Sequence, residues 1–180
     1  NREFVDILHA IDSNIQQLHN KLNVYEDVPA GEIEYFENLY KQSWHNLGRE
    51  GWGIGKTFND AQRNQHIEYA THLKYYTLLQ ESAFYWQIIN KPFGYAGDAQ
   101  MMRIIYKNDF DGKSVFGKVV NKFTTDERAC RAVRNRKSFL IDEIRKVGEG
   151  RILSLAAGPA EEIISVLNQE QDNHYEFLAL

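Results

Sequence analysis

The sequence has one cysteine, Cys130, so it cannot form an internal disulfide. A lone cysteine is typical of a reducing compartment, and we expect a cytoplasmic location. No stretch approaches the roughly 18 apolar residues that span a bilayer. An excess of basic residues is also absent, since 21 Lys and Arg stand against 25 Asp and Glu, for a net charge of −4. This balance argues against partners such as nucleic acid or an anionic membrane.

Both ends of the sequence lack the features of a complete chain. The first residue is Asn1 rather than methionine, and no signal peptide follows it. Residues 175–180 stop within an apolar run that has no polar tail. We therefore expect the 180 residues to be the front part of a longer protein. This length suffices for one domain and part of another.

Aromatic residues are abundant, with 10 Tyr, 10 Phe and 3 Trp, and they exclude a disordered chain. Apolar residues recur at intervals of three and four, which predicts helices over about 4–22, 32–47, 59–89, 101–106, 114–123 and 126–147. Asn59 or Asp60 is expected to cap the third helix and Asp98 the fourth. The last helix is predicted to bury Ala129, Val133, Phe139, Leu140 and Ile144. Through residue 147 the pattern is almost wholly helical.

Residues 48–55 contain four glycines and predict a flexible connector. They include Gly55-Lys56-Thr57, which invites comparison with a phosphate-binding loop. That motif needs a glycine five positions before Gly55, where this sequence has Glu50, and it follows a strand rather than a helix. A phosphate-binding loop is therefore not indicated.

The periodicity changes after a predicted linker at residues 148–150. A short apolar run, 152–156, is typical of a strand buried on both faces. A turn of small residues follows, then a helix that opens at Glu161, and 175–180 predict a second strand. Together these elements make a βαβ unit.

The small residues of this turn have a physical consequence. At the carboxyl end of a first strand, a turn without bulky side chains lets the backbone approach a cofactor, and the next helix presents free N–H groups. Glu161 and Glu162 would repel a pyrophosphate and suit a cationic cofactor better. From the pattern alone, cofactor binding and an ordinary α/β turn remain equally open.

Three segments, in order, resemble one enzyme family. Residues 152–163 (ILSLAAGPAEEI) resemble motif I of class I S-adenosylmethionine-dependent methyltransferases. They are most similar to the A-C-G-P-A-x-E version found in bacterial proteins that make 3-hydroxypalmitic acid methyl ester, a quorum-sensing signal. Residues 91–102 (KPFGYAGDAQMM) resemble the K-P-x-G-Y-A-G-D-x-x-M-M segment of that group, and 128–136 resemble its arginine-bearing helix. The first 70 residues match only as a helical region.

The resemblance implies a mainly α N-terminal domain, residues 1–147, that acts as a cap or substrate region. Residues 151–180 would then begin a truncated Rossmann-like α/β domain that binds S-adenosyl-L-methionine. The implied activity is O-methylation of a small or fatty-acyl carboxylate. The cofactor-binding residues that it implies are Ala156, Ala157, Gly158, Pro159 and Glu161. The residues that it implies for the substrate or cofactor pocket are Tyr95, Gly97, Asp98 and Arg136.

The sequence departs from the family pattern in the cofactor region. Gly158 alone remains of the usual glycine triplet, and Ser154 stands where many class I enzymes have an acidic residue for the methionine ammonium group. The acidic residue that grips the ribose normally ends the second strand, and Leu180 closes the sequence at about that point. Since a class I domain has about seven strands, we expect this fragment to be inactive alone.

Each candidate residue also has a structural interpretation. Gly97 can shape a turn, Asp98 can cap a helix, and Tyr95 can pack on the core. The arginines of 128–136 can form a solvated face paired with neighbouring acids, and Cys130 can be a buried structural thiol. The aromatic side chains can be core or can hold an acyl chain. The six histidines have no metal-ligand spacing, so no metal site is predicted.

Two other functions stay open. The helical region could be a non-catalytic binding or dimerisation module, with a homodimer as one form. The βαβ unit could serve a nicotinamide-dependent oxidoreductase. Against the second, residues 156–160 lack two of the three glycines of the G-x-G-x-x-G fingerprint.

Overall fold

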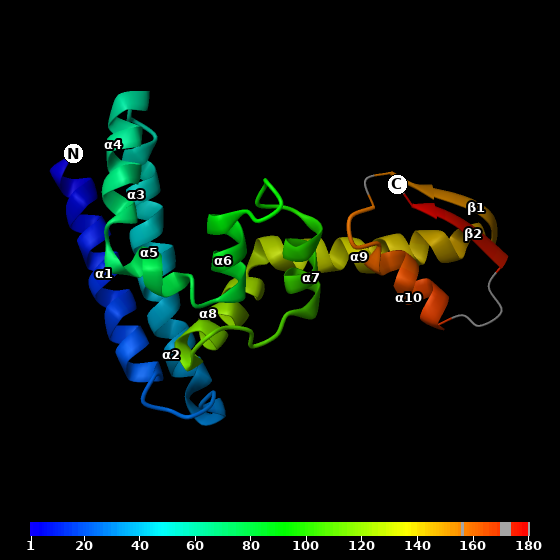
Figure 1. Cartoon of the computed structure of the whole chain (residues 1–180), viewed down its shortest axis with the longest axis horizontal. Coiled ribbons are helices and arrows are strands. Elements are labelled where there is room, and N and C mark those ends of the chain that lie inside the picture. The colour runs from blue at the N-terminus through cyan, green and yellow to red at the C-terminus, as the bar shows by residue number, and fades with distance from the viewer. Residues whose placement is uncertain (156, 170–173, 180) are drawn as a thin grey trace.

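The computed structural model describes residues 1–155, 157–169 and 174–179 (Figure 1). These residues are mostly helical and carry one two-stranded parallel sheet, which confirms the expected fold class at this coarse level. The helices before residue 126 form a helical body. The long helix α9 (Arg128–Val147) runs from that body to a βαβ unit at the other end of the molecule (Figure 1).

Helix α1 (Arg2–Leu22) begins at Asn1, whose side chain accepts a hydrogen bond from the Phe4 amide. Its predicted apolar stripe is buried at Leu8, Ile11, Ile15, Leu18 and Leu22, whereas Phe4 and Val5 are half-buried and Ile7 is buried in addition. On α1, Asp12 accepts a hydrogen bond of 2.7 Å from the Tyr75 amide of α5 (Lys74–Leu79). The stripe and this polar contact hold α5 against α1.

The predicted flexible connector at 48–55 is wrong, because these residues are helical. A 3₁₀ turn, η1 (Ala30–Glu32), leads into α2 (Ile33–Lys41), the π-helical η2 (Gln42–Leu47) and α3 (Gly48–Gly55), which follow one another without a break. Helix α3 packs along α1 at Gly51, where a Cβ would lie 3.4 Å from Cγ2 of Ile7. Tertiary packing thus overrides the low helix propensity of glycine, about 1 kcal/mol per residue.

The single helix predicted over about 59–89 is also wrong. Asn59 does cap a helix, in a capping box with Gln62, but the segment divides into α4 (Asp60–Thr71), α5 and α6 (Ala83–Asn90). The last break is fixed by Asn121, whose Oδ1 accepts hydrogen bonds from the Ser82 hydroxyl and the Phe84 amide. Ser82 and Phe84 lie 39 and 37 positions from Asn121 in the sequence, so the local sequence pattern does not predict the break between α5 and α6.

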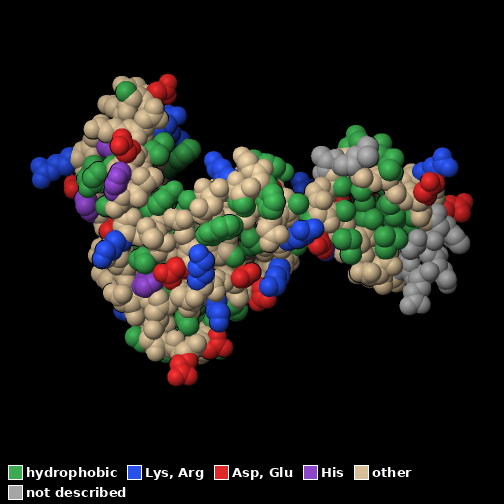
Figure 2. All heavy atoms as spheres, in the orientation of Figure 1, with side chains coloured by type: hydrophobic (Ala, Val, Ile, Leu, Met, Phe, Trp, Pro, Cys, Tyr) green, Lys and Arg blue, Asp and Glu red, His purple; other side chains and the backbone are tan. Residues whose placement is uncertain are grey.

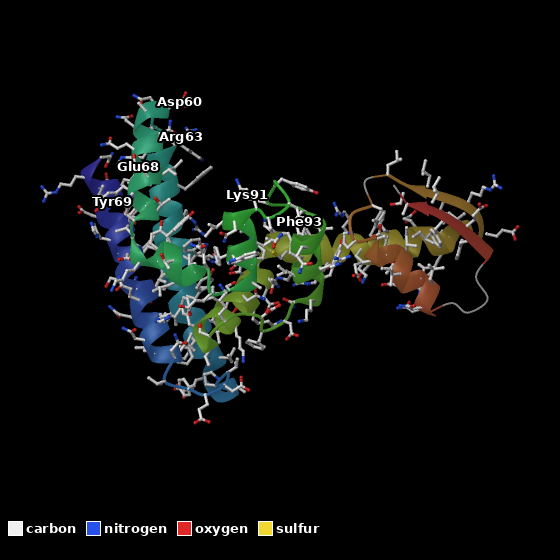
Figure 3. The ribbon with its side chains drawn as sticks, viewed as in Figure 1. Asp60, Arg63, Glu68, Tyr69, Lys91 and Phe93 are labelled. Atoms are coloured by element: carbon white, nitrogen blue, oxygen red, sulfur yellow. The ribbon has the colours of Figure 1, made fainter. Side chains whose placement is uncertain are left out.

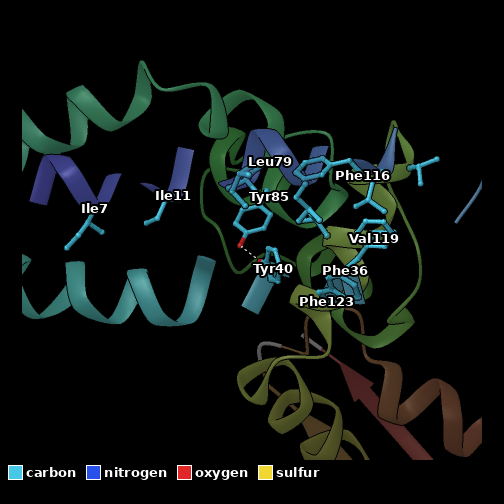
Figure 4. Packing of buried hydrophobic residues seen from close by; sticks show 14 residues of the cluster. Ile7, Ile11, Phe36, Tyr40, Leu79, Tyr85, Phe116, Val119 and Phe123 are labelled. Carbon is cyan, nitrogen blue, oxygen red and sulfur yellow. Dashed lines mark hydrogen bonds between the residues drawn. The ribbon is translucent and has the colours of Figure 1, made fainter. Parts of the chain in front are cut away.

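Helix α8 (Val115–Thr125) lies at the centre of the core and begins at the cap Ser114. Phe116, Val119 and Val120 are fully buried on it. Figure 4 shows Phe36 and Tyr40 of α2 and Tyr85 of α6 packed around this helix. The core therefore joins segments from α1 to α8 and lies in the helical body.

Two tyrosines form a polar contact inside this core. The hydroxyl oxygens of Tyr40 and Tyr85 lie 2.8 Å apart, and that of Tyr40 lies 3.0 Å from Oγ1 of Thr124 (Figure 4). Burial raises the pKa of Tyr40 to about 12 and raises the pKa of Tyr85 well above its ordinary value. Both side chains are therefore neutral in the folded protein at neutral pH.

We expect the free energy of unfolding to fall as the pH rises from about 10 to about 12, because tyrosines of the unfolded chain ionise first. The share of Tyr40 in this loss is on the order of 2 kcal/mol. Urea denaturation at several alkaline pH values measures it. The Tyr40→Phe variant should lose less stability over this range than the wild type, and equal losses would contradict the account.

Helix α7 (Ala99–Lys107) begins at Asp98, as predicted. Helix α9 is one helix, but its predicted apolar side is wrong in part: Ala129, Phe139 and Leu140 are exposed. Cys130 and Ile144 are the buried residues of α9. Helix α9 contacts α7 and α8 along one part of its length and α10 along another (Figure 1). Because no single neighbour runs along the whole helix, part of its apolar stripe stays exposed.

The βαβ unit consists of β1 (Glu149–Ser154), α10 (Glu161–Gln169) and β2 (His174–Ala179). The strands are parallel, with Ile152 opposite Phe177, and β1 begins inside the predicted linker. The prediction of a strand buried on both faces is wrong, because Leu153 and Leu178 are 56% and 58% exposed. Side chains alternate along a strand, so one face of this small sheet is uncovered. Figure 2 shows hydrophobic side chains gathered over it.

Candidate functional site

The turn after β1 is the first part of the candidate site. Ala156 lies outside the described residues, so nothing is assigned to it. Gly158 and Ala160 are left-handed, with φ of +56° and +49°. The Ala160 amide donates a 3.0 Å hydrogen bond to the Ala157 carbonyl, and Pro159 is buried. A Cβ at Gly158 would meet no atom of the described residues within 4 Å, so among these residues open space borders the turn.

This open space lies at the edge of the sheet where ligands usually bind in α/β proteins. Because β1 and β2 are parallel and in register from Glu149 to Ser154, their carboxyl ends meet at the edge where the turn begins. In open α/β sheets, ligands bind outside the carboxyl ends of the strands. The first amides of α10 also lack acceptors within the helix. Backbone donors and space are thus available to a ligand at the turn.

Glu161, the first residue of α10, is held by a residue that the sequence patterns did not indicate. Nζ of Lys137 on α9 lies 3.4 Å from Oε2 of Glu161 and 5.5 Å from the ring centre of Tyr106 on α7. Lys137 therefore ties the start of α10 to α7 and α9. Glu162 forms no ion pair with any residue that the structure describes, so its charge is the one left uncompensated beside the turn.

Replacing Lys137 with methionine should loosen α10 while keeping most of the apolar stem. The ion pair is partly exposed, so we expect a local loss of about 0.5–1 kcal/mol. Amide hydrogen exchange of α10 measures it and should become faster, with α8 unchanged. Lys146→Met, which breaks the Lys146–Glu143 pair within α9, is the control. Equal exchange of α10 in both variants would show that Lys137 does not hold it.

The second part of the candidate site is the loop 91–98 between α6 and α7. Lys91 and Gly94 are left-handed, with φ of +44° and +90°, and the Gly94 amide donates to the Lys91 carbonyl. Asp98 is 3% exposed. Its Oδ1 accepts from the Met101 amide at 2.9 Å and its Oδ2 from Nε2 of Gln87 at 2.6 Å. Both carboxylate oxygens are occupied, so Asp98 positions the loop.

The exposed aromatic residues of this loop are Phe93 and Tyr95, which are 69% and 60% exposed. The interpretation that Tyr95 packs on the core is therefore wrong. Its ring lies against Gly97, which is exposed as well. A cleft of about 500 Å³ borders the loop, with Trp86, Phe93 and Lys113 among its lining residues. Figure 3 shows Lys91 and Phe93 on this loop.

The two parts of the site are linked indirectly. No hydrogen bond or ion pair between described residues joins the loop 91–98 to the turn 157–160. The connection passes through α7, which Asp98 caps and whose Tyr106 contacts Lys137. The two regions that the sequence singles out are thus both attached to one helix, α7.

Arg136 is exposed on α9, and it forms no hydrogen bond or ion pair with the part of the chain that is described. Arg134, in contrast, forms several polar contacts within the protein. Its guanidinium donates to the carbonyls of Thr125 at 2.7 Å and Ile105 at 3.1 Å, and it lies 3.6 Å from the Asp126 carboxylate. The carbonyls at helix ends attract cations, and this is the signal that could have singled out Arg134.

Cys130 is a buried structural thiol, as one interpretation of the sequence predicts. It packs with Met101 and Ile105, and burial raises its pKa. Among the described residues, no three His, Cys, Asp or Glu side chains are grouped so that they could hold a metal ion. Within the same residues, no helix has both the length and the apolar character needed to cross a membrane.

Comparison with known proteins gives no assignment. No family model, curated protein or solved structure matches the chain significantly. The function must therefore be argued from the residues and their geometry.

Proposed function

We propose that the chain is part of an S-adenosylmethionine-dependent methyltransferase that O-methylates a small or fatty-acyl carboxylate. The observation that carries the proposal is the turn 157–160. It follows the first strand of a parallel βαβ unit, it has open space beside Gly158, and it falls on the residues that resemble motif I. The loop 91–98, which resembles the upstream segment of the same family, supports it.

The residues at the turn fit this cofactor. S-adenosylmethionine is a cation that carries the transferable methyl group on its sulfonium. The side-chain-poor turn would bind its amino-acid and ribose portions through backbone groups, and Glu162 would add a favourable charge. Glu161 contributes less charge than expected, because Lys137 compensates it. Its role is to hold the start of α10 in place.

The cleft beside the loop 91–98 is the proposed place for the apolar part of the methyl acceptor, whose carboxylate must itself reach the methyl group at the turn. Trp86 and Phe93 supply apolar contacts for that part. A carboxylate is already a nucleophile, so the reaction needs positioning and removal of water rather than a general base. Asp98 acts as a positioning residue, since it fixes both the loop and the start of α7.

Calorimetric titration of the full-length protein with S-adenosylmethionine, S-adenosylhomocysteine and NADH tests the proposal. We expect both adenosyl compounds to bind and NADH not to bind. Binding of NADH alone would favour the oxidoreductase, and no binding of any of the three would favour a helical binding module.

Paired glycine variants locate the site. Gly158→Ala and Gly148→Ala both place a Cβ on a left-handed residue with open space around it. The first should weaken binding of S-adenosylhomocysteine by about tenfold or more, and the second should leave it unchanged.

A further inference from the structure

The helical body contains a pocket of about 470 Å³ between α1, α3 and α4. This volume is within the range of small-molecule sites. Its walls include Phe4, Ile7 and Ile11 of α1, together with Ile67 of α4 and Phe58, which precedes the cap of α4. Helix α4 and the βαβ unit lie at opposite ends of the molecule (Figure 1), so this pocket is separate from the turn 157–160.

One wall of the pocket is a helix face on which three of the four lining residues are glycines and the fourth is Trp52. Gly48, Gly51 and Gly55 of α3 all line it, and their spacing of three and four places them on one helix face. Gly53 lies on the other side of α3 and does not line it. Close packing against α1 explains why residue 51 is a glycine. It does not explain Gly48, because a Cβ there would meet no described atom within 4 Å. A glycine destabilises a helix by about 1 kcal/mol relative to alanine. At position 48 the missing side chain leaves room for a ligand.

The mouth of the pocket exposes large apolar side chains. Trp52 of α3 and Ile67 of α4 line it and are 68% and 56% exposed. Figure 2 shows hydrophobic side chains gathered over α3 and α4, beside the hollow that separates them from α6. Exposed apolar residues that are grouped around a cavity mark binding sites more often than scattered ones do.

The charged groups of the pocket have one sign. No lining residue is acidic, although Asp and Glu outnumber Lys and Arg in the sequence. Lys56 and Arg63 line it (Figure 3 shows Arg63 on α4), and Lys56 lies over the Trp52 ring. Arg63 has no ion pair within the described part of the chain. His66 is buried between Phe4 and Phe58, and burial lowers its pKa, so it adds a neutral ring to the floor.

We propose that this pocket binds an amphiphile with an apolar body and one anionic head group. The body lies along the glycine face of α3, and the head lies near Arg63 and Lys56. The proposal does not rest on methyl transfer, because the pocket is distinct from the turn and from the cleft at 91–98.

Two probes with similar apolar chains and head groups of opposite charge test the proposal: decanoate and decyltrimethylammonium, titrated below their micelle concentrations and without S-adenosylmethionine. We expect decanoate to bind about tenfold more tightly or better. Equal affinity for the two probes, or no binding of decanoate, would overturn the proposal.

Variants then place the decanoate in the pocket. Gly48→Leu fills it and should weaken decanoate binding about tenfold or more, whereas Gly53→Leu, on the other side of the same helix, should not. Arg63→Gln should weaken binding about threefold to tenfold, and Arg103→Gln on α7 is its charge-matched control. Circular dichroism and melting curves establish that the variants fold. Wild-type affinity in folded Gly48→Leu would place decanoate elsewhere and reject this pocket.

Discussion

Replacing Gly117 with alanine should cost about 3 kcal/mol or more of the free energy of unfolding. Gly117 is buried in α8, and a Cβ there would lie 2.6 Å from the carbonyl carbon of Glu81. The obstructing atoms belong to the backbone, so no side chain can rotate away. Glu81 is also fixed, because its carbonyl accepts a 2.8 Å hydrogen bond from the Lys113 amide. The substitution must therefore push α8 away from the segment that precedes α6.

Urea denaturation followed by circular dichroism measures this cost. Gly53→Ala in α3 is the matched control, because a Cβ there meets no atom within 4 Å and alanine favours the helix. The control should gain up to about 1 kcal/mol. Wild-type stability in Gly117→Ala would mean that α8 does not lie so close to Glu81.

The second large effect concerns Asp98. In Asp98→Ala, α7 loses its cap, and the Gln87 amide is left buried without an acceptor. The two losses together should cost about 2–4 kcal/mol. Asp98→Asn keeps an oxygen for the Met101 amide, and its Nδ2 can donate to Oε1 of Gln87 once the Gln87 amide rotates, so its cost should be about 1 kcal/mol.

The same pair of variants separates positioning from direct contact with a ligand. If the proposed methyl transfer occurs and Asp98 only positions the loop, folded Asp98→Asn should keep most of that activity, with KM changed more than kcat. A loss in Asp98→Asn as severe as in Asp98→Ala, at near wild-type stability, would instead show that the negative charge itself acts on the ligand.

Local signals were enough to predict several elements. Asn59 and Asp98 cap helices because a short polar side chain there accepts from an amide three residues later. The apolar stripe of α1 and the change of period after residue 147 likewise depend on neighbours in sequence. What these signals could not indicate is the effect of distant contacts. Helix α3 forms because Gly51 packs on α1, and α6 begins at Ala83 because Asn121 binds Ser82 and Phe84.

In the candidate site, too, some features follow from the local sequence and others depend on distant contacts. The turn after β1 and the parallel pairing could be predicted, since a short apolar strand, small residues and a helix follow one another in sequence. Lys137 and Gln87 could not, because their partners Glu161 and Asp98 are 24 and 11 positions away and on other elements. Arg134 and Arg136 look alike in the sequence, and only the ends of α7 and α8 distinguish them.

Amide hydrogen exchange can show whether the turn at 157–160 contacts S-adenosylmethionine, as proposed. Exchange is compared in the full-length protein with and without saturating S-adenosylhomocysteine. If the turn contacts the bound compound, we expect slower exchange in peptides that cover 157–163, with the exchange of the α1 and α4 amides unchanged. Unchanged exchange at 157–163 in the presence of bound compound, or protection confined to α1 and α4, would contradict it.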